Sequence, residues 1–481
     1  MENLTLVASL AFLAATSVLT HTLHQAWIGF ALAPVPLLFY RQDAFRMMVL
    51  ALSTYLLFYE AFMPSSNFLW FNTQDSLLIV YIAMTAFFSP NLAVFSIPMS
   101  AGLVPLYAFI LYGFALSIQP IMEFGFDFYV MRDVKCLLFL CLVPLMCRKG
   151  EALFNPKNAY RILLAIIVFT SVHSIVLLFG FFTTGNRVTT WNEIFFSDSV
   201  LIAPILLTLH PEKRIRRLLL ACLPICLIGL LATQTRGLWL STLFSFATYI
   251  GIRLFKSRTL KISSLLKGGM TALAILCVGE IILRVAMGRG LYEFVISRMM
   301  SMDNHELVNP YSSLGYRIHE SLVVWDKRTW FGHGSGARLY LFFTQLGMSK
   351  FINWWSIHSE YFEILHKYGF IGLGIFMTFL ATLMRRAYRI AVHGKAFPSA
   401  LGFVAFTTLL NHCLVSITSG YIIRENVMLY LVILVGIVER YYPRVFPSLA
   451  APAATMATGL AAGSVAGAEP GPASGSAVEP T

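Results

Sequence analysis

Apolar stretches of 15 to 20 residues recur along the 481 residues of this chain, and they constrain its fold more than any other feature. A helix needs about 20 apolar residues to cross the hydrocarbon core of a bilayer. The chain is 58% hydrophobic and 12% charged, whereas soluble domains are roughly a quarter charged. A soluble fold could not bury so many continuous apolar runs, so the sequence predicts an all-α polytopic membrane protein.

The apolar runs give up to fourteen candidate spans, and we expect about 12 (12–14) transmembrane helices. Several runs in the first 150 residues are short or contain proline, so we expect some of them to merge or to be re-entrant. The candidate runs lie at 4–20, 26–40, 47–63, 76–89, 92–118, 134–147, 162–181, 199–210, 218–234, 237–252, 268–287, 369–384, 400–418 and 427–439.

Basic side chains gather in the short links between these runs, where 21 of the 35 Lys and Arg residues are found. The positive-inside rule explains this pattern, so the net charge of +12 does not indicate a nucleic-acid partner. If all the basic links are cytoplasmic, both termini are cytoplasmic and residues 288–367 form an extracytoplasmic loop. We expect this loop to be ordered and largely helical, with helices near 311–327 and 337–352.

The sequence predicts one transmembrane domain over residues 1–448, followed by a disordered cytoplasmic tail at 449–481 that is rich in Ala, Gly, Pro, Ser and Thr. The seven cysteines lie in or beside apolar runs and form no CxxC pair. They are typical of small core residues rather than of disulfides or metal ligands. No His, Asp and Glu cluster has metal-ligand spacing, so we expect neither a metal nor a cofactor.

Arg236 lies in the segment Thr233-Gln-Thr-Arg236-Gly237-Leu-Trp239, between two basic links at 211–217 and 253–267. Because both links are predicted to be cytoplasmic, Arg236 should lie at the outer apex of a tight helical hairpin. An Arg at membrane depth is costly and usually paired, and its fork of donors suits phosphate. Both an anion site and a snorkelling Arg at a helix end are compatible with this pattern.

The long loop contains Arg317 and Glu320, which share a helix face at a spacing of three residues. This spacing suits a plain surface ion pair as well as a functional site. Further on, the segment Gly332-His333-Gly334-Ser-Gly336 predicts a tight turn. A phosphate-binding loop is one interpretation of it, although alternate glycines are a weak signal.

His358 follows Trp354 and Trp355 and precedes a helix that is predicted to re-enter the membrane. The positive end of a helix disfavours an imidazolium, and a neutral His can take a proton from a hydroxyl. The alternative interpretation of His358 is a polar residue that caps the helix.

Together, the three segments resemble the O-antigen ligase and polymerase superfamily. The resemblance consists of an Arg-Gly-x-Trp hairpin, an outer loop with an Arg helix and a Gly-x-Gly turn, and a His-Ser-x-Tyr segment that leads into Gly-x-x-Gly-Leu. It covers roughly residues 215–385, while the N-terminal half is similar to the family only in hydropathy. His333 departs from the family, in which a small or apolar residue is more usual.

The resemblance implies a GT-C-like fold and a metal-independent glycosyltransferase at the periplasmic face of a Gram-negative inner membrane. Such an enzyme transfers a glycan from undecaprenyl diphosphate to a sugar hydroxyl of lipid A-core, in contact with membrane lipids. Arg236 and Arg317 would bind the donor diphosphate, and His358 would be the catalytic base. Candidate supporting residues are Glu360, Tyr361, Trp355, His333 and Arg338.

Two other functions fit parts of the pattern. An O-antigen polymerase of the same superfamily would show the same hairpin and loop. A transporter uses broken helices and buried ionisable groups, but it does not need an ordered aromatic and basic outer loop. The groups that could serve a transporter are Glu60, His173, Glu280, Arg284 and His412.

The predicted topology can be tested with reporter fusions at residues 260, 305, 390 and 445. We expect these fusions to report inside, outside, inside and inside, because the basic links stay in the cytoplasm. An outside signal at residue 260 or residue 390 would contradict the topology and the outer location of the loop.

Overall fold

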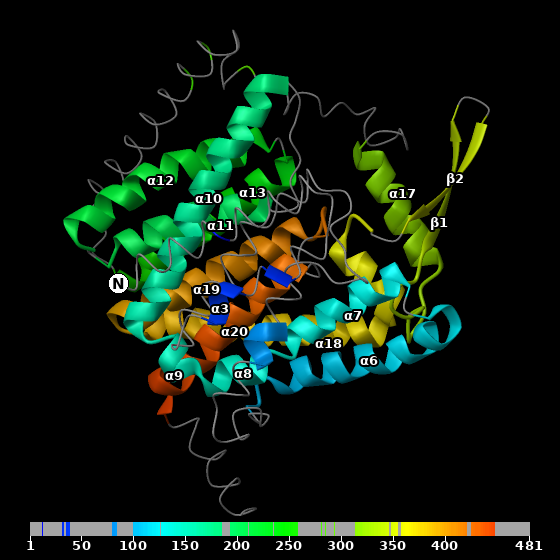
Figure 1. Cartoon of the computed structure of the whole chain (residues 1–481), viewed down its shortest axis with the longest axis horizontal. Coiled ribbons are helices and arrows are strands. Elements are labelled where there is room, and N and C mark those ends of the chain that lie inside the picture. Colours follow the sequence, from blue (N-terminus) through cyan, green and yellow to red (C-terminus); the bar gives the residue numbers. More distant parts are fainter. Residues whose placement is uncertain are drawn as a thin grey trace, which may run out of the picture.

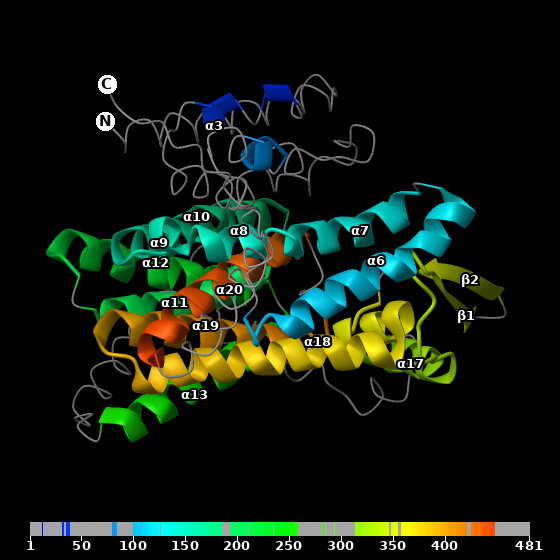
Figure 2. The same ribbon diagram turned by 90° about the horizontal axis from the view of Figure 1, so that it is seen from below.

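The computed structural model describes nine segments of the chain together with a few short stretches, mostly before residue 84. The nine segments are residues 100–125, 127–184, 193–209, 211–233, 235–257, 313–345, 348–354, 357–420 and 425–447. Helices pack side by side in a bundle, and one helix with a β-hairpin lies at one end of it (Figures 1 and 2). The elements are α3 (Val35–Leu38), α6 (Val104–Phe124), α7 (Phe128–Leu140), α8 (Val143–Arg148), α9 (Gly150–Leu153), α10 (Pro156–Thr184), α11 (Glu193–Leu207), α12 (Lys213–Ala232), α13 (Arg236–Ser257), α17 (Ser313–Asp326), β1 (Leu339–Gln345), β2 (Met348–Trp354), α18 (Glu360–His393), α19 (Ala396–Val415) and α20 (Glu425–Val445).

Within the described residues, six helices are long and apolar enough to cross a membrane: α6, α10, α12, α13, α18 and α19. This finding confirms a multi-pass helical membrane protein. The predicted spans at 4–20, 47–63 and 268–287 fall almost entirely outside the described residues, so the count of twelve stays a prediction. The predicted tail at 449–481 also lies outside them.

The last residues of α13 lie beside the residues that connect α18 to α19, at one end of the helix bundle. The Lys256 Nζ near the end of α13 donates to the carbonyls of Ala391 and Gly394, at 2.8 and 2.9 Å. The end of α13 therefore meets the residues between α18 and α19, and Lys256 lies at the same end of the bundle as they do. The beginnings of α13 and α18 lie at the other end, together with α17.

Polar side chains buried inside the bundle join three of its helices. The His412 Nε2 on α19 lies 2.7 Å from a carboxylate oxygen of Asp198 on α11. The neighbouring Asn411 donates to Ser197 at 2.6 Å and accepts from Ser241 of α13 at 2.8 Å. Polar groups at membrane depth are costly unless they are paired, so these contacts fix α11, α13 and α19 against one another.

Residues 337–352 do not form the helix that we expected, and this prediction was wrong. Residues 339–345 and 348–352 instead belong to an antiparallel hairpin of β1 and β2, in which Leu339 pairs with Trp354 and Gln345 with Met348. Tyr, Phe, Thr, Ile and Trp are frequent in these two runs, and such residues favour strands. The glycine at position 347 falls in the two-residue connection, which is a common hairpin signal. The other predicted loop helix, at 311–327, is confirmed as α17.

Helix α18 is kinked at Gly369, and the turn at Gly332–Gly336 docks against the kink. Gly369 has a φ of 67°, which interrupts the helical backbone. The freed carbonyls of His366 and Lys367 accept hydrogen bonds from the amides of His333 and Gly334, at 3.0 and 2.9 Å. The glycine turn is therefore fixed through backbone hydrogen bonds to α18, a helix long and apolar enough to cross a membrane.

Four charged side chains support the same junction. The Lys367 Nζ donates to Asp133 of α7 at 2.9 Å and to Glu363 at 2.5 Å. Arg132 contacts Glu363 at 3.2 Å, and Asp133 also accepts from the amide of Gly336 at 2.7 Å. Buried charges persist only when they are paired in this way, so the cluster (Arg132, Asp133, Glu363 and Lys367) ties α7, α18 and the glycine turn together.

Gly369→Ala should destabilise the protein by at least about 1 kcal/mol, because a residue with a side chain is strained at positive φ. A Cβ at this position would also collide with the carbonyl of Trp330. The control is Gly374→Ala on the same helix, where a Cβ meets nothing within 4 Å. We expect thermal unfolding in detergent to occur at a lower temperature for Gly369→Ala only; equal unfolding temperatures would contradict the role of the kink.

Candidate functional site

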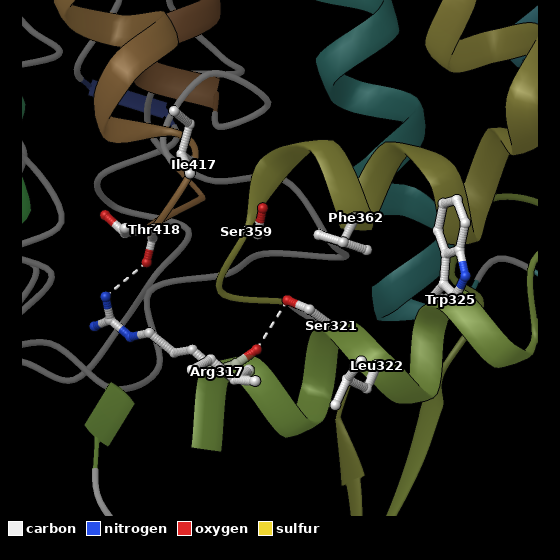
Figure 3. Close-up of a pocket in the computed structure, with 9 residues that line it drawn as sticks. Arg317, Ser321, Leu322, Trp325, Ser359, Phe362, Ile417 and Thr418 are labelled. Atoms are coloured by element: carbon white, nitrogen blue, oxygen red, sulfur yellow. Dashed lines mark hydrogen bonds between the residues drawn. The ribbon is translucent and has the colours of Figure 1, made fainter. Parts of the chain in front are cut away.

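Helix α17 presents two charged residues that bind different partners. Its apolar residues Ile318, Leu322 and Trp325 recur at helical spacing and are partly exposed. Glu320 is fully buried on another face. Arg317 lies one turn away from Glu320 and extends toward the segment that follows α19 (Figure 3). The helix therefore contributes a cation and a buried carboxylate to two neighbouring positions.

The carboxylate of Glu320 contacts His358 twice. One oxygen accepts a hydrogen bond from the His358 backbone amide at 2.8 Å and lies 3.1 Å from its Nδ1. The ring of Tyr316 meets the imidazole edge to face, with the ring centroids 5.4 Å apart. The imidazole side chain remains 36% exposed, so it is oriented from one side and accessible from the other.

Glu360 and Tyr361, which we considered as partners of His358, make other contacts in the first turn of α18. The Tyr361 hydroxyl donates to the carbonyl of Cys413 at 2.7 Å. The Glu360 amide donates to the carbonyl of Ser416 at 3.0 Å. These contacts join the beginning of α18 to the end of α19, while Glu320 contacts the imidazole.

Arg317 binds the segment after α19 directly. Its Nη1 donates to the carbonyl of Thr418 at 2.6 Å and lies 3.5 Å from the hydroxyl of Ser419. We did not predict a role for this segment, residues 416–420, because it contains no charged residue or histidine. A polar Ser-Ile-Thr-Ser-Gly run at the outer end of a predicted span was the available signal.

Arg236 begins α13 beside the same threonine. A Cβ on Gly237 would lie 2.6 Å from the Thr418 hydroxyl, so the glycine allows the start of α13 to approach this residue closely. The preceding Thr235 donates to the buried Glu193 of α11 at 2.6 Å, and the Trp239 indole donates to the carbonyl of Leu230 at 2.9 Å. These bonds close the predicted hairpin and fix the position of Arg236.

A groove of about 490 Å³ lies between α17, the first turn of α18 and the segment after α19 (Figure 3). Arg317 lines one end and Trp325 the other, with hydroxyl groups and aliphatic side chains between them. The lining residues are Arg317, Ile318, Ser321, Leu322, Trp325, Ser359, Phe362, Ile417 and Thr418. The groove can therefore accept a ligand that is apolar along most of its length and anionic at one end.

The glycine turn is not the phosphate-binding loop that we considered. Its residues have positive φ angles, 82° at Gly332, 87° at Gly334 and 75° at Gly336. The amides of Gly332 and Gly336 donate to Thr329 and Asp133 at 2.7 Å each. The amides of His333 and Gly334 donate to α18, as described above. Because these amides bind protein acceptors, the turn has a docking role.

Two candidate supporting residues belong to this docking region, and one cannot be placed. The His333 Nε2 lies 3.0 Å from the carbonyl of Lys327, and its ring lies 4.8 Å from that of His366. Arg338 pairs with Asp127 at 3.1 Å and covers the ring of Tyr129. Trp355 lies outside the described residues. In the described part of the chain, no group of three or more His, Cys, Asp or Glu side chains could bind a metal ion.

Comparison with known proteins agrees with the motifs. A family model described as O-antigen ligase matches residues 220–377, a range that contains Arg236, Arg317 and His358. The match confirms the predicted resemblance to the O-antigen ligase and polymerase superfamily over this range. No curated protein matches the chain.

Proposed function

We propose that this chain, which carries an O-antigen ligase domain at residues 220–377, transfers an O-antigen-type polysaccharide from undecaprenyl diphosphate to a sugar hydroxyl of lipid A-core. The reaction takes place at the periplasmic face of the inner membrane of a Gram-negative bacterium. The convergence of the three motif segments carries this proposal. Arg317 and Gly237, the residue next to Arg236, both approach Thr418, and His358 contacts Glu320 one turn along α17 from Arg317.

The two arginines suit the leaving group of this reaction. When the bond between the anomeric carbon and the diphosphate breaks, negative charge grows on the diphosphate, and fixed cations lower the barrier most where charge develops. A guanidinium binds phosphate oxygens with two parallel donors. The mechanism therefore requires no metal ion, since Arg236 and Arg317 supply the positive charge.

His358 suits the other half of the reaction. The acceptor hydroxyl gives its proton to the imidazole of His358. At the same time, the oxygen of that hydroxyl forms a bond to the anomeric carbon of the donor sugar. The bond from that carbon to the diphosphate oxygen breaks, and undecaprenyl diphosphate leaves. The imidazolium then returns its proton to solvent. The partial exposure of His358 allows a bulky acceptor to reach it.

In a deletion strain, we expect lipid-linked polymer to accumulate and lipid A to carry none.

When they are expressed in that strain, Arg236→Ala and Arg317→Ala should fail to restore ligation, with a loss of at least about 10²-fold, because each removes a cation that stabilises the leaving group. Lysine should rescue poorly, since it lacks the bidentate fork. The measurement is the amount of polymer on lipid A, beside the amount of protein in the membrane.

The control is Lys327→Ala, which removes one positive charge from an exposed residue just after α17 that does not line the groove. Ligation at the normal level with alanine at both Arg236 and Arg317 would contradict the diphosphate role. Single unpolymerised units on lipid A in the deletion strain would identify a polymerase instead.

Ligation by the purified enzyme should survive thorough chelation, and strict dependence on a divalent cation would contradict the proposed chemistry.

Purified His358→Ala should bind the lipid donor normally but transfer the glycan about 10² to 10⁴ times more slowly in a single turnover, which is the usual contribution of a general base. His393→Ala, at the far and exposed end of α18, is the matched control. Lost donor binding with a normal rate at saturating donor would make His358 a phosphate ligand. Full activity would make it a helix cap.

A further inference from the structure

We propose that Glu320 is the positioning residue for the catalytic base, and that its carboxylate selects the His358 tautomer in which Nδ1 carries the proton. This inference rests on the proposed function, in which His358 accepts the proton of the acceptor hydroxyl. It assigns a role to a buried acid 38 residues away in the sequence.

The contact geometry determines which nitrogen of the imidazole is protonated. An ionised carboxylate has no proton to donate, so it can only accept hydrogen bonds. The Nδ1 atom at 3.1 Å from Glu320 must therefore carry the hydrogen of that bond. In a neutral imidazole, Nε2 then has the lone pair, and Nε2 is the atom that can take the proton from a hydroxyl.

The second contact fixes the backbone of His358 as well as its ring. The same Glu320 oxygen accepts the His358 amide hydrogen at 2.8 Å, just before α18 begins at Glu360. One oxygen thus holds both the chain and the imidazole, while the ring of Tyr316 bounds the imidazole on a further side. The side chain is left with little rotational freedom, which lowers the entropic cost of reaching the reactive geometry.

The charge of Glu320 matters when the proton moves. As His358 takes the proton, the imidazole becomes a cation next to a carboxylate whose exposed fraction is 0%. Opposite charges attract more strongly in such a buried environment than in water, so Glu320 stabilises the imidazolium that forms. An uncharged acceptor at the same place would keep the hydrogen bonds but lose this stabilisation.

Glu320→Gln separates the proposal from a purely structural role, because the amide oxygen can still accept both hydrogen bonds from His358. We expect the single-turnover rate to fall by about 10²-fold or more, since the charge is lost and the amide can also donate to Nδ1 and select the wrong tautomer. Donor binding and the unfolding temperature should not change. Glu320→Asp, which retains the charge, should recover part of the rate. Asp326→Asn is the matched control, because it removes an exposed carboxylate from the same helix.

The double variant Glu320→Gln/His358→Ala completes the test. If Glu320 acts through His358, the double variant should transfer as slowly as His358→Ala alone, because residues that act as a unit are not additive. A further loss of rate, or a normal rate for Glu320→Gln beside an inactive His358→Ala, would overturn the proposal and leave the proposed function standing. Full activity of His358→Ala would instead contradict the base role itself.

Discussion

The backbone groups freed by the kink in α18 must find hydrogen-bond partners, and this requirement shapes the region around the candidate site. Unpaired carbonyl and amide groups are very costly in or near a bilayer. The kink at Gly369 creates such groups, and the turn at Gly332–Gly336 together with Thr329 and Trp330 satisfies them. An extramembrane loop is thereby joined to a membrane-spanning helix at a defined register. Helix α17, which ends six residues before Gly332, takes its position from the same junction.

The charged cluster at Arg132, Asp133, Glu363 and Lys367 has the same structural effect from the opposite side of the turn. Two of its ion pairs, Arg132–Glu363 and Lys367–Asp133, cross from α7 to α18, and Asp133 also binds the turn directly. Glu363 and Lys367 stand in the part of α18 before the kink, within two turns of its first residue. The first turn of α18, which lines the groove, is therefore braced by charge pairing, in addition to its backbone bond to Ser416.

The sequence predicted what depends on local pattern. Hydropathy located the helices, and the start of α17 was predicted to within two residues. The basic links 253–267 and 385–399 were predicted to be cytoplasmic, and Lys256 of the first contacts the residues between α18 and α19. The hairpin of β1 and β2 was missed because apolar and aromatic runs of seven residues suit either structure. In that case the glycine at position 347 and the abundance of aromatic residues should have decided the matter.

The partners within the site depend on contacts between distant residues, which no periodicity encodes. Glu320 is 38 residues from His358, and Arg317 is 101 residues from Thr418. From spacing alone, Arg317 and Glu320 suggested a local ion pair, whereas the fold directs one toward Thr418 and buries the other against an imidazole. Thr418 carried no chemical signal, because its backbone carbonyl, which every residue possesses, is the group that Arg317 binds.

The length of α18 has a consequence for how two lipid-borne molecules can meet. Its 34 residues extend about 50 Å, while the hydrocarbon layer is about 30 Å thick. The part from Phe370 onward is long enough to cross that layer by itself, so the ten residues of α18 that precede Phe370, up to the kink at Gly369, are not needed to span the hydrocarbon. In the proposed reaction, both substrates would diffuse in the plane of the membrane, and each would present its reactive group at a height set by its own lipid anchor and sugars. Under the proposed function, α18 would hold His358 at a fixed height relative to the membrane. A donor and an acceptor would then react only if their reactive groups both reach that height, whatever the composition of the polymer that extends beyond.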